Sequence, residues 1–407
     1  MKQAIVITIG NELLQGYTLD TNASWISSYL RDRDIEVSNR LTVGDSKQEI
    51  VSSLSYAINK IKINLIIITG GLGPTHDDIT KDVLKEYFST DFIVDKNYLS
   101  ILKSKFVRIN MRIPKNISSQ ATYLKNSLPI SNKNGTALGM QIVDNNVTVL
   151  VLPGVPSEMK QMVQDCDLFK TLKLKNKYYT IKTAGIYENK LYEILFKEIQ
   201  LNKNFKIAFL PNYSGVDIRL SRLSKISEKL FSEFKHKIRK LIGKYIYSDS
   251  DELLEEVLGK KLNTLNLKLS VAESCTGGII SKKISNVPGA SKYFSGSVIA
   301  YNNNIKKKIL NVNKETIEKF GPVSEEVAIE MARGVLLITD SDISVATTGI
   351  SGPDGGTDEK PIGLIYIAIN YRNKNIVKKF NLPSNRKIHR EIASNIALNM
   401  IRLVINK

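Results

Sequence analysis

The chain's strongest candidate for chemistry is the stretch Ala272-Glu273-Ser274-Cys275-Thr276-Gly277-Gly278. An apolar run over 267–271 precedes it and predicts a buried strand, and the residues 279–284 that follow predict a helix. A strand-to-helix turn exposes a nucleophilic side chain and directs the free N–H groups of the helix start toward the same point. The stretch therefore predicts hydrolysis of an amide or an ester. A capped turn, whose glycines serve only the backbone, is the competing interpretation.

Two further loops of the last section are expected to meet this turn. One offers Tyr301 and Lys306, and the other offers Thr348 together with the glycine-rich run 349–356. No histidine adjoins these loops in the sequence, so a serine nucleophile needs another base, and a Ser–Lys pair is a known solution. Lys306 could serve if burial lowers its pKa toward neutrality. The Gly277 and Gly278 amides are expected to hold the oxyanion.

Cys275 is the competing nucleophile, because a thiol at a helix N-terminus is activated by a lowered pKa. The sequence alone leaves this choice between Ser274 and Cys275 open.

The first section, to about residue 170, alternates continuous apolar strands with amphipathic helices, which predicts a largely parallel sheet covered on both faces. Two glycine-rich loops, 70–80 and 152–159, follow predicted strands and precede helices, which is the place and form of an anion cradle. Asp77 and Asp78 could hold Mg²⁺ together with phosphate oxygens. The competing interpretation is a helix cap. The loop 134–139 could line the same cleft.

We expect three domains, 1–170, 171–250 and 251–407, all of mixed α/β type, because 407 residues exceed one ordinary core. The middle section predicts a compact α+β unit without a G-x-x-G loop, which favours a spacer or dimerisation role over RNA recognition. The last section is again α/β.

The formal net charge is +18, but the lysines are spread over all parts of the chain, which disfavours nucleic acid as a partner. No apolar run is long enough to cross a membrane, and the apolar N-terminus predicts a first core strand and no signal peptide. The two cysteines form neither a disulfide framework nor a zinc pattern, which suits the cytoplasm.

Five motifs together resemble the CinA family (competence/damage-inducible protein) over nearly the whole chain. They are Gly10-Asn11-Glu12-Leu13-Leu14 with Gly16, Asp20 and Asn22; residues 70–80; residues 152–159; residues 272–278; and residues 348–353 with Lys360-Pro361-Ile362-Gly363. The resemblance implies a molybdopterin-binding-like N-terminal domain, a KH-like middle domain and a C-terminal nicotinamide mononucleotide deamidase domain. It also implies a metal-dependent ADP-ribose pyrophosphatase activity in the first domain, no cofactor for the amidase, and a homodimer.

The resemblance also implies roles for individual residues. The catalytic group is Ser274, Lys306 and Tyr301. The substrate-binding group is Cys275, Thr276, Gly277, Gly278, Thr348, Gly349, Gly352, Arg386 and Arg390, with the two arginines facing the 5′-phosphate. The N-terminal nucleotide-binding group is Glu12, Asn22, Gly70, Gly71, Gly73, Thr80, Gly135, Gly154, Ser157 and Glu158, with Asp77 and Asp78 for the metal. A different class of function, a non-enzymatic adaptor in competence or DNA damage, remains the alternative.

Overall fold

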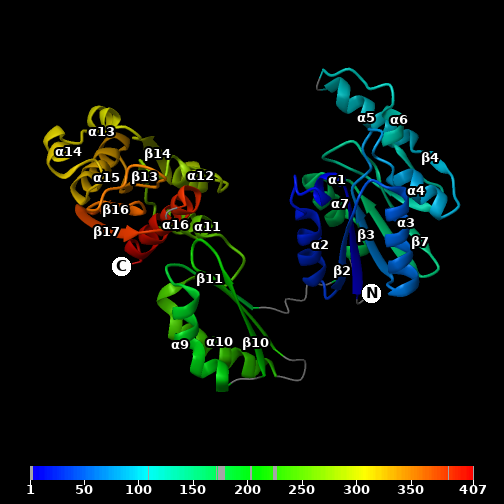
Figure 1. The fold of residues 1–407 in the computed structure, drawn as a ribbon, viewed down its shortest axis with the longest axis horizontal. Coiled ribbons are helices and arrows are strands. Elements are labelled where there is room, and N and C mark those ends of the chain that lie inside the picture. Colours follow the sequence, from blue (N-terminus) through cyan, green and yellow to red (C-terminus); the bar gives the residue numbers. More distant parts are fainter. Residues whose placement is uncertain are drawn as a thin grey trace. The chain divides into compact units, whose positions relative to one another are not determined.

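The computed structural model describes residues 3–108, 110–170, 172, 179–201, 204–222, 227–383 and 385–406. The chain divides into two compact units, Met1–Lys177 and Tyr178–Lys407, and each is described by itself (Figure 1). The stretch 178–184 also predicts a strand, which the structure describes over Tyr179–Thr183; Tyr178 lies outside the described residues.

The first unit contains a six-stranded sheet in the order β2-β1-β3-β8-β7-β6. Its strands are β1 (Gln3–Ile9), β2 (Glu36–Val43), β3 (Leu65–Thr69), β6 (Ser127–Ile130), β7 (Gly139–Asp144) and β8 (Val147–Leu152), with β4 (Phe92–Val94) and β5 (Thr122–Leu124) as a separate pair. Its helices are α1 (Asn11–Leu14), α2 (Thr21–Arg31), α3 (Lys47–Ser55), α4 (Thr80–Tyr87), α5 (Lys96–Arg108), α6 (Ile117–Gln120), α7 (Pro156–Asp165) and α8 (Asp167–Lys170).

The central strands of this sheet are buried on both faces, because alternate residues enter two different cores. Ile5 and Ile7 of β1 pack with α3 and α4, whereas Ala4 and Val6 pack with α2 and α7. The strands β2, β1, β3 and β8 are parallel, as the sequence predicts, while β7 and β6 are antiparallel. Helix α3 continues beyond Ser55 as a wider π-type turn at Tyr56–Lys60.

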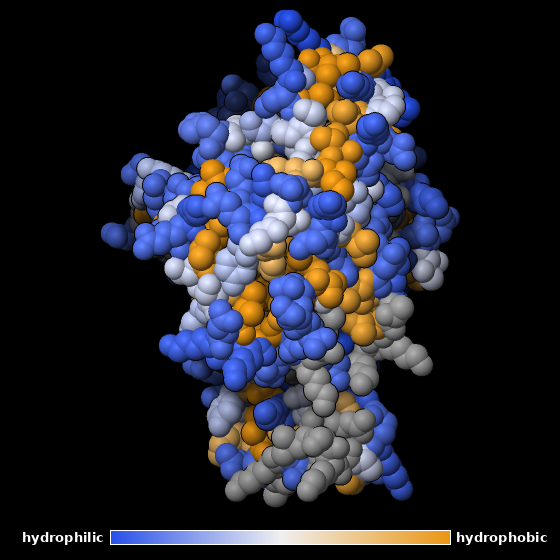
Figure 2. All heavy atoms as spheres, turned by 90° about the vertical axis from the view of Figure 1, so that its right-hand side faces the viewer, coloured by the Kyte–Doolittle hydropathy of each residue, from blue (hydrophilic) through white to orange (hydrophobic). Residues whose placement is uncertain are grey.

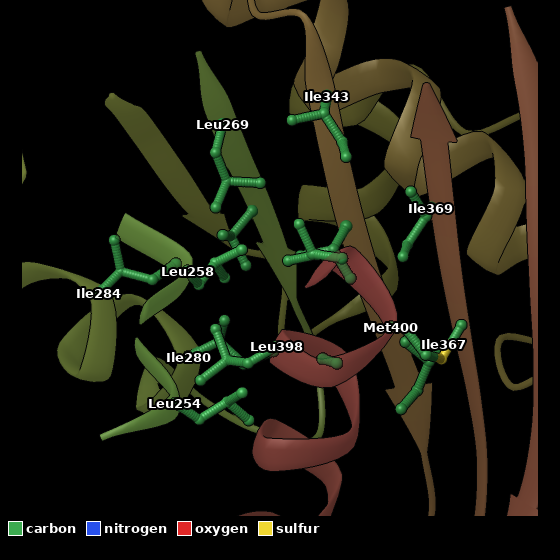
Figure 3. Packing of buried hydrophobic residues seen from close by; sticks show 14 of the residues in the cluster. Leu254, Leu258, Leu269, Ile280, Ile284, Ile343, Ile367, Ile369, Leu398 and Met400 are labelled. Carbon is green, nitrogen blue, oxygen red and sulfur yellow. The ribbon is translucent and has the colours of Figure 1, made fainter. Parts of the chain in front are cut away.

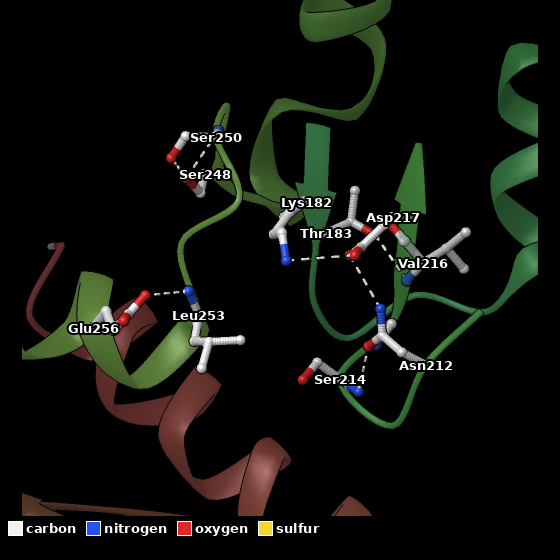
Figure 4. Close-up of polar contacts among 11 residues, drawn as sticks. Lys182, Thr183, Asn212, Ser214, Val216, Asp217, Ser248, Ser250, Leu253 and Glu256 are labelled. Carbon is white, nitrogen blue, oxygen red and sulfur yellow. Dashed lines mark hydrogen bonds and ion pairs between the residues drawn. The ribbon is translucent and has the colours of Figure 1, made fainter. Parts of the chain in front are cut away.

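The second unit begins with an α+β section in which the sheet β10-β11-β9-β12 packs against two helices. The elements are β9 (Tyr179–Thr183), α9 (Glu188–Leu201), β10 (Phe205–Pro211), β11 (Val216–Arg222), α10 (Glu228–Ile242) and β12 (Ile246–Ser248). Figure 4 shows Lys182 of β9 beside Asp217 of β11, with 3.5 Å between the amine and the carboxylate. This section is joined to the last helix, where Arg402 donates to the Ile246 carbonyl at 3.1 Å.

The remainder of this unit is a five-stranded sheet in the order β14-β13-β15-β16-β17, covered on both faces by helices. Its strands are β13 (Leu269–Glu273), β14 (Phe294–Ile299), β15 (Ile343–Gly349), β16 (Leu364–Tyr371) and β17 (Lys374–Asn381). Its helices are α11 (Leu254–Thr264), α12 (Ile279–Ser285), α13 (Asn303–Leu310), α14 (Lys314–Phe320), α15 (Glu325–Thr339) and α16 (Arg386–Val404).

One core of this domain lies between the sheet and the helices α11, α12 and α16. In Figure 3, Leu258 of α11, Ile280 of α12 and Leu398 of α16 gather beside Leu269 of β13. The opposite core joins α13 and α15 to the other face. Because β14, β13 and β15 are parallel, their carboxyl ends lie at one edge of the sheet, which positions the loops that follow them.

The surface is mostly hydrophilic in the view of Figure 2, with hydrophobic residues in interrupted patches. Within the described part of the chain, no helix is long and apolar enough to cross a membrane.

Candidate active site

The turn after β13 lies between the ends of its two neighbouring strands. The Ser274 amide donates to the Thr347 carbonyl of β15 at 3.0 Å, and the Ala300 amide after β14 donates to the Glu273 carbonyl at 2.8 Å. Ser274 is 8% exposed, and its hydroxyl has no hydrogen-bond partner among the described residues. The serine hydroxyl is therefore free of protein partners at the edge where ligands bind in such sheets.

The carboxylate of Glu273 caps helix α12 from inside the domain. It accepts from the amides of Gly278 at 2.9 Å, Ile280 at 3.2 Å and Ser281 at 2.9 Å, and from the Ser281 hydroxyl. Glu273 is fully buried. The positive end of this helix is thus compensated by the protein's own anion, so it does not offer the free N–H groups that the sequence predicts.

The Gly277 and Gly278 amides, which were expected to hold the oxyanion, already donate to acceptors within the protein. The Gly278 amide is bonded to Glu273, and the Gly277 amide donates to the Ser274 carbonyl at 3.2 Å. In the described part of the chain, the amides of Cys275 and Thr276 donate to no other residue. Esterases of the nucleophile-elbow type use the amide directly after the nucleophile as an oxyanion donor. The two glycines instead supply the backbone form of the turn, with φ of +56° and +94°.

Lys306 of α13 is buried, as its expected role requires. It is 3% exposed, and its Nζ donates to the Pro322 carbonyl at 3.2 Å and to Thr348 Oγ1 at 3.4 Å. Burial lowers the pKa of Lys306 to about 8, and the nearby Cys275 thiol acts in the opposite direction. Lys306 therefore lies beside the residue that follows Ser274, although its hydrogen bonds go to other partners.

The expected activation of Cys275 is wrong. Burial raises the pKa of its thiol to about 12, against the smaller opposing effect of Lys306. The thiol is thus protonated at neutral pH and is a poor nucleophile.

The remaining predicted residues support the turn or approach it from α16. Arg390 donates to the Thr276 carbonyl through Nη2 at 2.9 Å and Nε at 3.2 Å. Arg386 donates to the Gly352 carbonyl at 2.9 Å and also to the hydroxyl of Tyr301, which is 61% exposed. Arg390 is therefore engaged by the turn itself, whereas Arg386 joins two loops at the surface.

The threonines of the site face inward. Thr348 Oγ1 donates to the Pro322 carbonyl at 2.7 Å, and the hydroxyls of Thr276 and Thr347 lie 2.8 Å apart. All three residues are fully buried. Thr348 thus holds the lysine and its neighbouring turn, a different role from the expected substrate contact.

Sequence reasoning missed a second group of polar contacts behind this site. His389 Nδ1 lies 2.9 Å from Ser351 Oγ, and Nε2 lies 3.3 Å from the Gly363 carbonyl. Burial lowers the pKa of His389. The histidine ties both ends of the loop between β15 and β16 to α16. The sequence signal for these contacts was His389, near the start of the predicted closing helix.

The N-terminal residues group around two places. Glu12, Asn22 and Gly154 line a small cavity of about 90 Å³ at the ends of β1, β3 and β8. Asn22 donates to the Gly154 carbonyl at 2.7 Å, while its buried Oδ1 has no hydrogen-bond partner among the described residues. Gly70 adjoins this place, because its amide donates to the Leu152 carbonyl at 3.0 Å and a Cβ at position 154 would lie 3.5 Å from its Cα. Thr80 holds the glycine loop, since its hydroxyl donates to the Gly70 carbonyl at 3.1 Å and its amide donates to the Gly71 carbonyl at 3.2 Å.

The second place holds the carboxylate of Glu158. Asn132 donates to it at 2.6 Å, and a Cβ at position 135 would lie 2.1 Å from it. A side chain at position 135 would therefore displace the Glu158 carboxylate from its present place. The carbonyl of the neighbouring Ser157 accepts a hydrogen bond from the Asn134 side chain at 3.3 Å.

The predicted metal ligands lie on an exposed loop. Asp78 Oδ2 accepts from the Thr75 amide at 2.9 Å and from the Thr75 hydroxyl, so Asp78 shapes its own turn, against which Gly73 packs. The side chain of Asp77 is 60% exposed. Among the described residues, no three acidic, cysteine or histidine side chains form a metal-holding group. Asp77 and Asp78 therefore fit only a site in which Mg²⁺ is held by one or two carboxylates together with the phosphates of a substrate.

Comparisons with known proteins cover all three domains. Residues 5–168 match the model "Probable molybdopterin binding domain", residues 179–248 match "Damage-inducible protein CinA KH domain", and residues 251–405 match "CinA C-terminal domain". The chain thus has the mixed α/β architecture expected of it: a molybdopterin-binding-like, a KH-like and a CinA C-terminal domain.

Two relatives with full-length similarity support the same grouping, and one solved structure is similar over part of the chain. The chain is 38% identical to the "CinA-like protein" of Thermosipho melanesiensis over 413 residues, covering 100% of both chains. It is 36% identical over 406 residues to a protein of Clostridium botulinum named for competence-damage induction, covering 98% of this chain and 99% of that one. The crystal structure of a competence/damage inducible protein from Agrobacterium tumefaciens is 33% identical, covers 39% of this chain and 100% of its own, and has a TM-score of 0.36.

Proposed function

This chain belongs to the CinA family, and we propose that its C-terminal domain is an amidohydrolase that converts nicotinamide mononucleotide to nicotinic acid mononucleotide and ammonia. The observation that supports this proposal most is the buried Lys306, whose pKa of about 8 leaves an appreciable neutral fraction near physiological pH. Lys306 lies beside Cys275, the residue that follows Ser274, and the Ser274 hydroxyl has no hydrogen-bond partner among the described residues, so the site favours a serine nucleophile with a neutral amine as its base.

In the proposed reaction, Lys306 takes the proton of the Ser274 hydroxyl while Ser274 Oγ attacks the carboxamide carbon. The amides of Cys275 and Thr276 stabilise the negative oxygen that forms. The protonated Lys306 then gives its proton to the departing nitrogen, and ammonia leaves with the former amide bond broken. Water, deprotonated by the same amine, cleaves the acyl-serine and releases the acid.

Because Glu273 already caps α12, the substrate phosphate is expected to bind elsewhere. Arg386 is the nearest candidate: it is exposed, it contacts Tyr301, and guanidinium groups suit phosphate oxygens. Arg390 is expected to support the Ser274 turn through the Thr276 carbonyl and not to bind the phosphate directly.

The test is ammonia release from nicotinamide mononucleotide by the purified full-length chain. We expect one ammonia per acid formed, and a loss of at least about 10³-fold in Ser274→Ala. Cys275→Ala is the matched control at the next position and should keep activity within about tenfold, because its thiol stays protonated. Full activity in Ser274→Ala together with loss in Cys275→Ala would transfer the nucleophile to the cysteine.

The N-terminal domain supports a second proposal, a metal-dependent ADP-ribose pyrophosphatase. The specific observation is the cavity at the ends of β1, β3 and β8, where the buried Asn22 Oδ1 lacks a partner in the described part of the chain. Asp77 and Asp78 would hold the divalent metal with the diphosphate, and the metal would neutralise charge on its oxygens. EDTA should abolish ADP-ribose cleavage and leave ammonia release unchanged. DNA binding without either reaction would instead favour the adaptor alternative.

A further inference from the structure

The amine of Lys306 belongs to a closed triangle of hydrogen bonds. Its Nζ donates to the Pro322 carbonyl and to Thr348 Oγ1, and the Thr348 hydroxyl donates to the same carbonyl at 2.7 Å. A neutral amine has two N–H bonds and one lone pair. When both N–H bonds point at these two oxygens, the direction of the lone pair is fixed. The position of the Pro322 carbonyl therefore decides where the base can accept a proton.

The turn that presents this carbonyl is held by a lysine from another loop. Lys360 Nζ donates to the Val323 carbonyl at 2.9 Å and to the Phe320 carbonyl, which flank Pro322 on both sides. Gly321, between them, has φ of +77°, and a Cβ there would lie 2.8 Å from Lys360 Nζ. The turn is thus closed around the lysine's ammonium group, with no room for a larger residue.

Lys360 is itself fixed within the loop between β15 and β16. Its amide donates to Thr357 Oγ1 at 3.0 Å, and its carbonyl accepts from the Thr357 amide at 2.9 Å. The same loop is attached to α16 by the Ser351–His389 contact. Lys360 therefore connects a well-anchored loop to the turn that orients the base.

We propose that Lys360 is a positioning residue, which fixes the turn 320–323 and through the Pro322 carbonyl aims the lone pair of Lys306. The inference rests on the proposed function, since it assigns Lys306 as the base. The groups that face the Lys306 amine are the Cys275 thiol, Thr348 of β15 and the Pro322 carbonyl. Lys360 donates to the turn and not to the Lys306 amine, and the pKa of that amine is set by burial and by Cys275, so we expect the effect of Lys360 to pass through the turn.

The test follows the protonation state of Lys306 with a reagent that is not the natural substrate. A small alkyl fluorophosphonate reacts with an activated serine, whose oxygen displaces fluoride, and the rate follows the protonation state of the base. In the wild-type chain, we expect labelling of Ser274 to rise with pH and reach half its maximum near pH 8. In Lys360→Met, the turn relaxes and water reaches Lys306. The midpoint should therefore move up by about one pH unit, and the rate at pH 7 should fall about tenfold.

Lys268→Met is the matched control, because Lys268 Nζ also donates to a main-chain carbonyl, that of Lys292 at 2.8 Å, but near the start of β13. Its midpoint should equal that of the wild type. If Lys360→Met does not fold, Lys360→Gln, which keeps a donor with a shorter reach, takes its place. Its midpoint should move upward in the same way.

The outcomes separate the two proposals. An unchanged midpoint in a folded Lys360 variant, with Ser274 labelled normally, overturns the positioning role alone. A midpoint that moves equally in Lys268→Met also overturns it, because the effect would then be general. A wild-type Ser274 that is not labelled at any pH overturns the nucleophile and, with it, the role of Lys360.

Discussion

The Ser274 turn and the Asp77–Asp78 loop both follow a parallel strand and precede a helix, yet the protein treats them in opposite ways. Ser274 is 8% exposed, and Glu273, Lys306 and Arg390 around its turn are all bonded to protein partners. The Asp77 side chain is 60% exposed. The polar groups of the first turn are already bonded within the protein, whereas the Asp77 carboxylate of the second is left largely to water.

This difference has a physical cause. Buried polar groups lose the solvation of water, so they persist only where the fold supplies partners. An exposed carboxylate keeps its water and needs no such network. Substitutions at the Ser274 turn should therefore lower both the activity and the free energy of unfolding. Substitutions at the Asp77–Asp78 loop should have an effect only when a ligand is bound there.

The largest expected effect is that of Lys306→Met. Removing a general base typically costs about 10²–10⁴-fold in rate, and the methionine keeps the volume of the buried stem. We expect kcat for ammonia release to fall by this factor with little change in the binding of nicotinamide mononucleotide. Lys308→Met, on the exposed side of the same helix, is the control and should retain full activity. Equal losses in both variants would contradict a specific role for Lys306.

The next effect is the loss of the buried cap in Glu273→Ala. This change leaves three main-chain N–H groups and one hydroxyl without their acceptor. We expect the free energy of unfolding to fall by about 3 kcal/mol or more, measured by urea denaturation. Asp78→Ala in the exposed loop should change it by less than about 1 kcal/mol. Similar values for the two variants would remove the contrast between the two sites.

The smallest effect concerns pH. The neutral form of Lys306 is the base, and burial places its pKa at about 8. Below that pH the amine is increasingly protonated, so kcat should fall about tenfold per pH unit, and above it kcat should level off. Cys275→Ala should keep the same profile, because the pKa of that thiol is about 12. A rate independent of pH between 6 and 8 would show that another group is the base.

The sequence predicted most of the framework of these sites. Continuous apolar runs such as 64–69 and 343–347 predicted the buried strands, and the glycines at 277 and 278 marked the turn before α12. The antiparallel strands β6 and β7 were missed, because short, half-exposed strands have no continuous apolar signal. The family resemblance supplied the residue roles.

The sequence by itself therefore placed Ser274 on a strand-to-helix turn, favoured Lys306 over a histidine as the candidate base, and predicted that three loops would converge around that turn. Only the tertiary structure decided which polar groups are already engaged. Glu273 occupies the amides of α12, Arg390 holds the turn through the Thr276 carbonyl, and burial separates the pKa values of Lys306 and Cys275. The reason is that hydrogen-bond partners and desolvation depend on residues far apart in the chain, and local patterns contain no record of them.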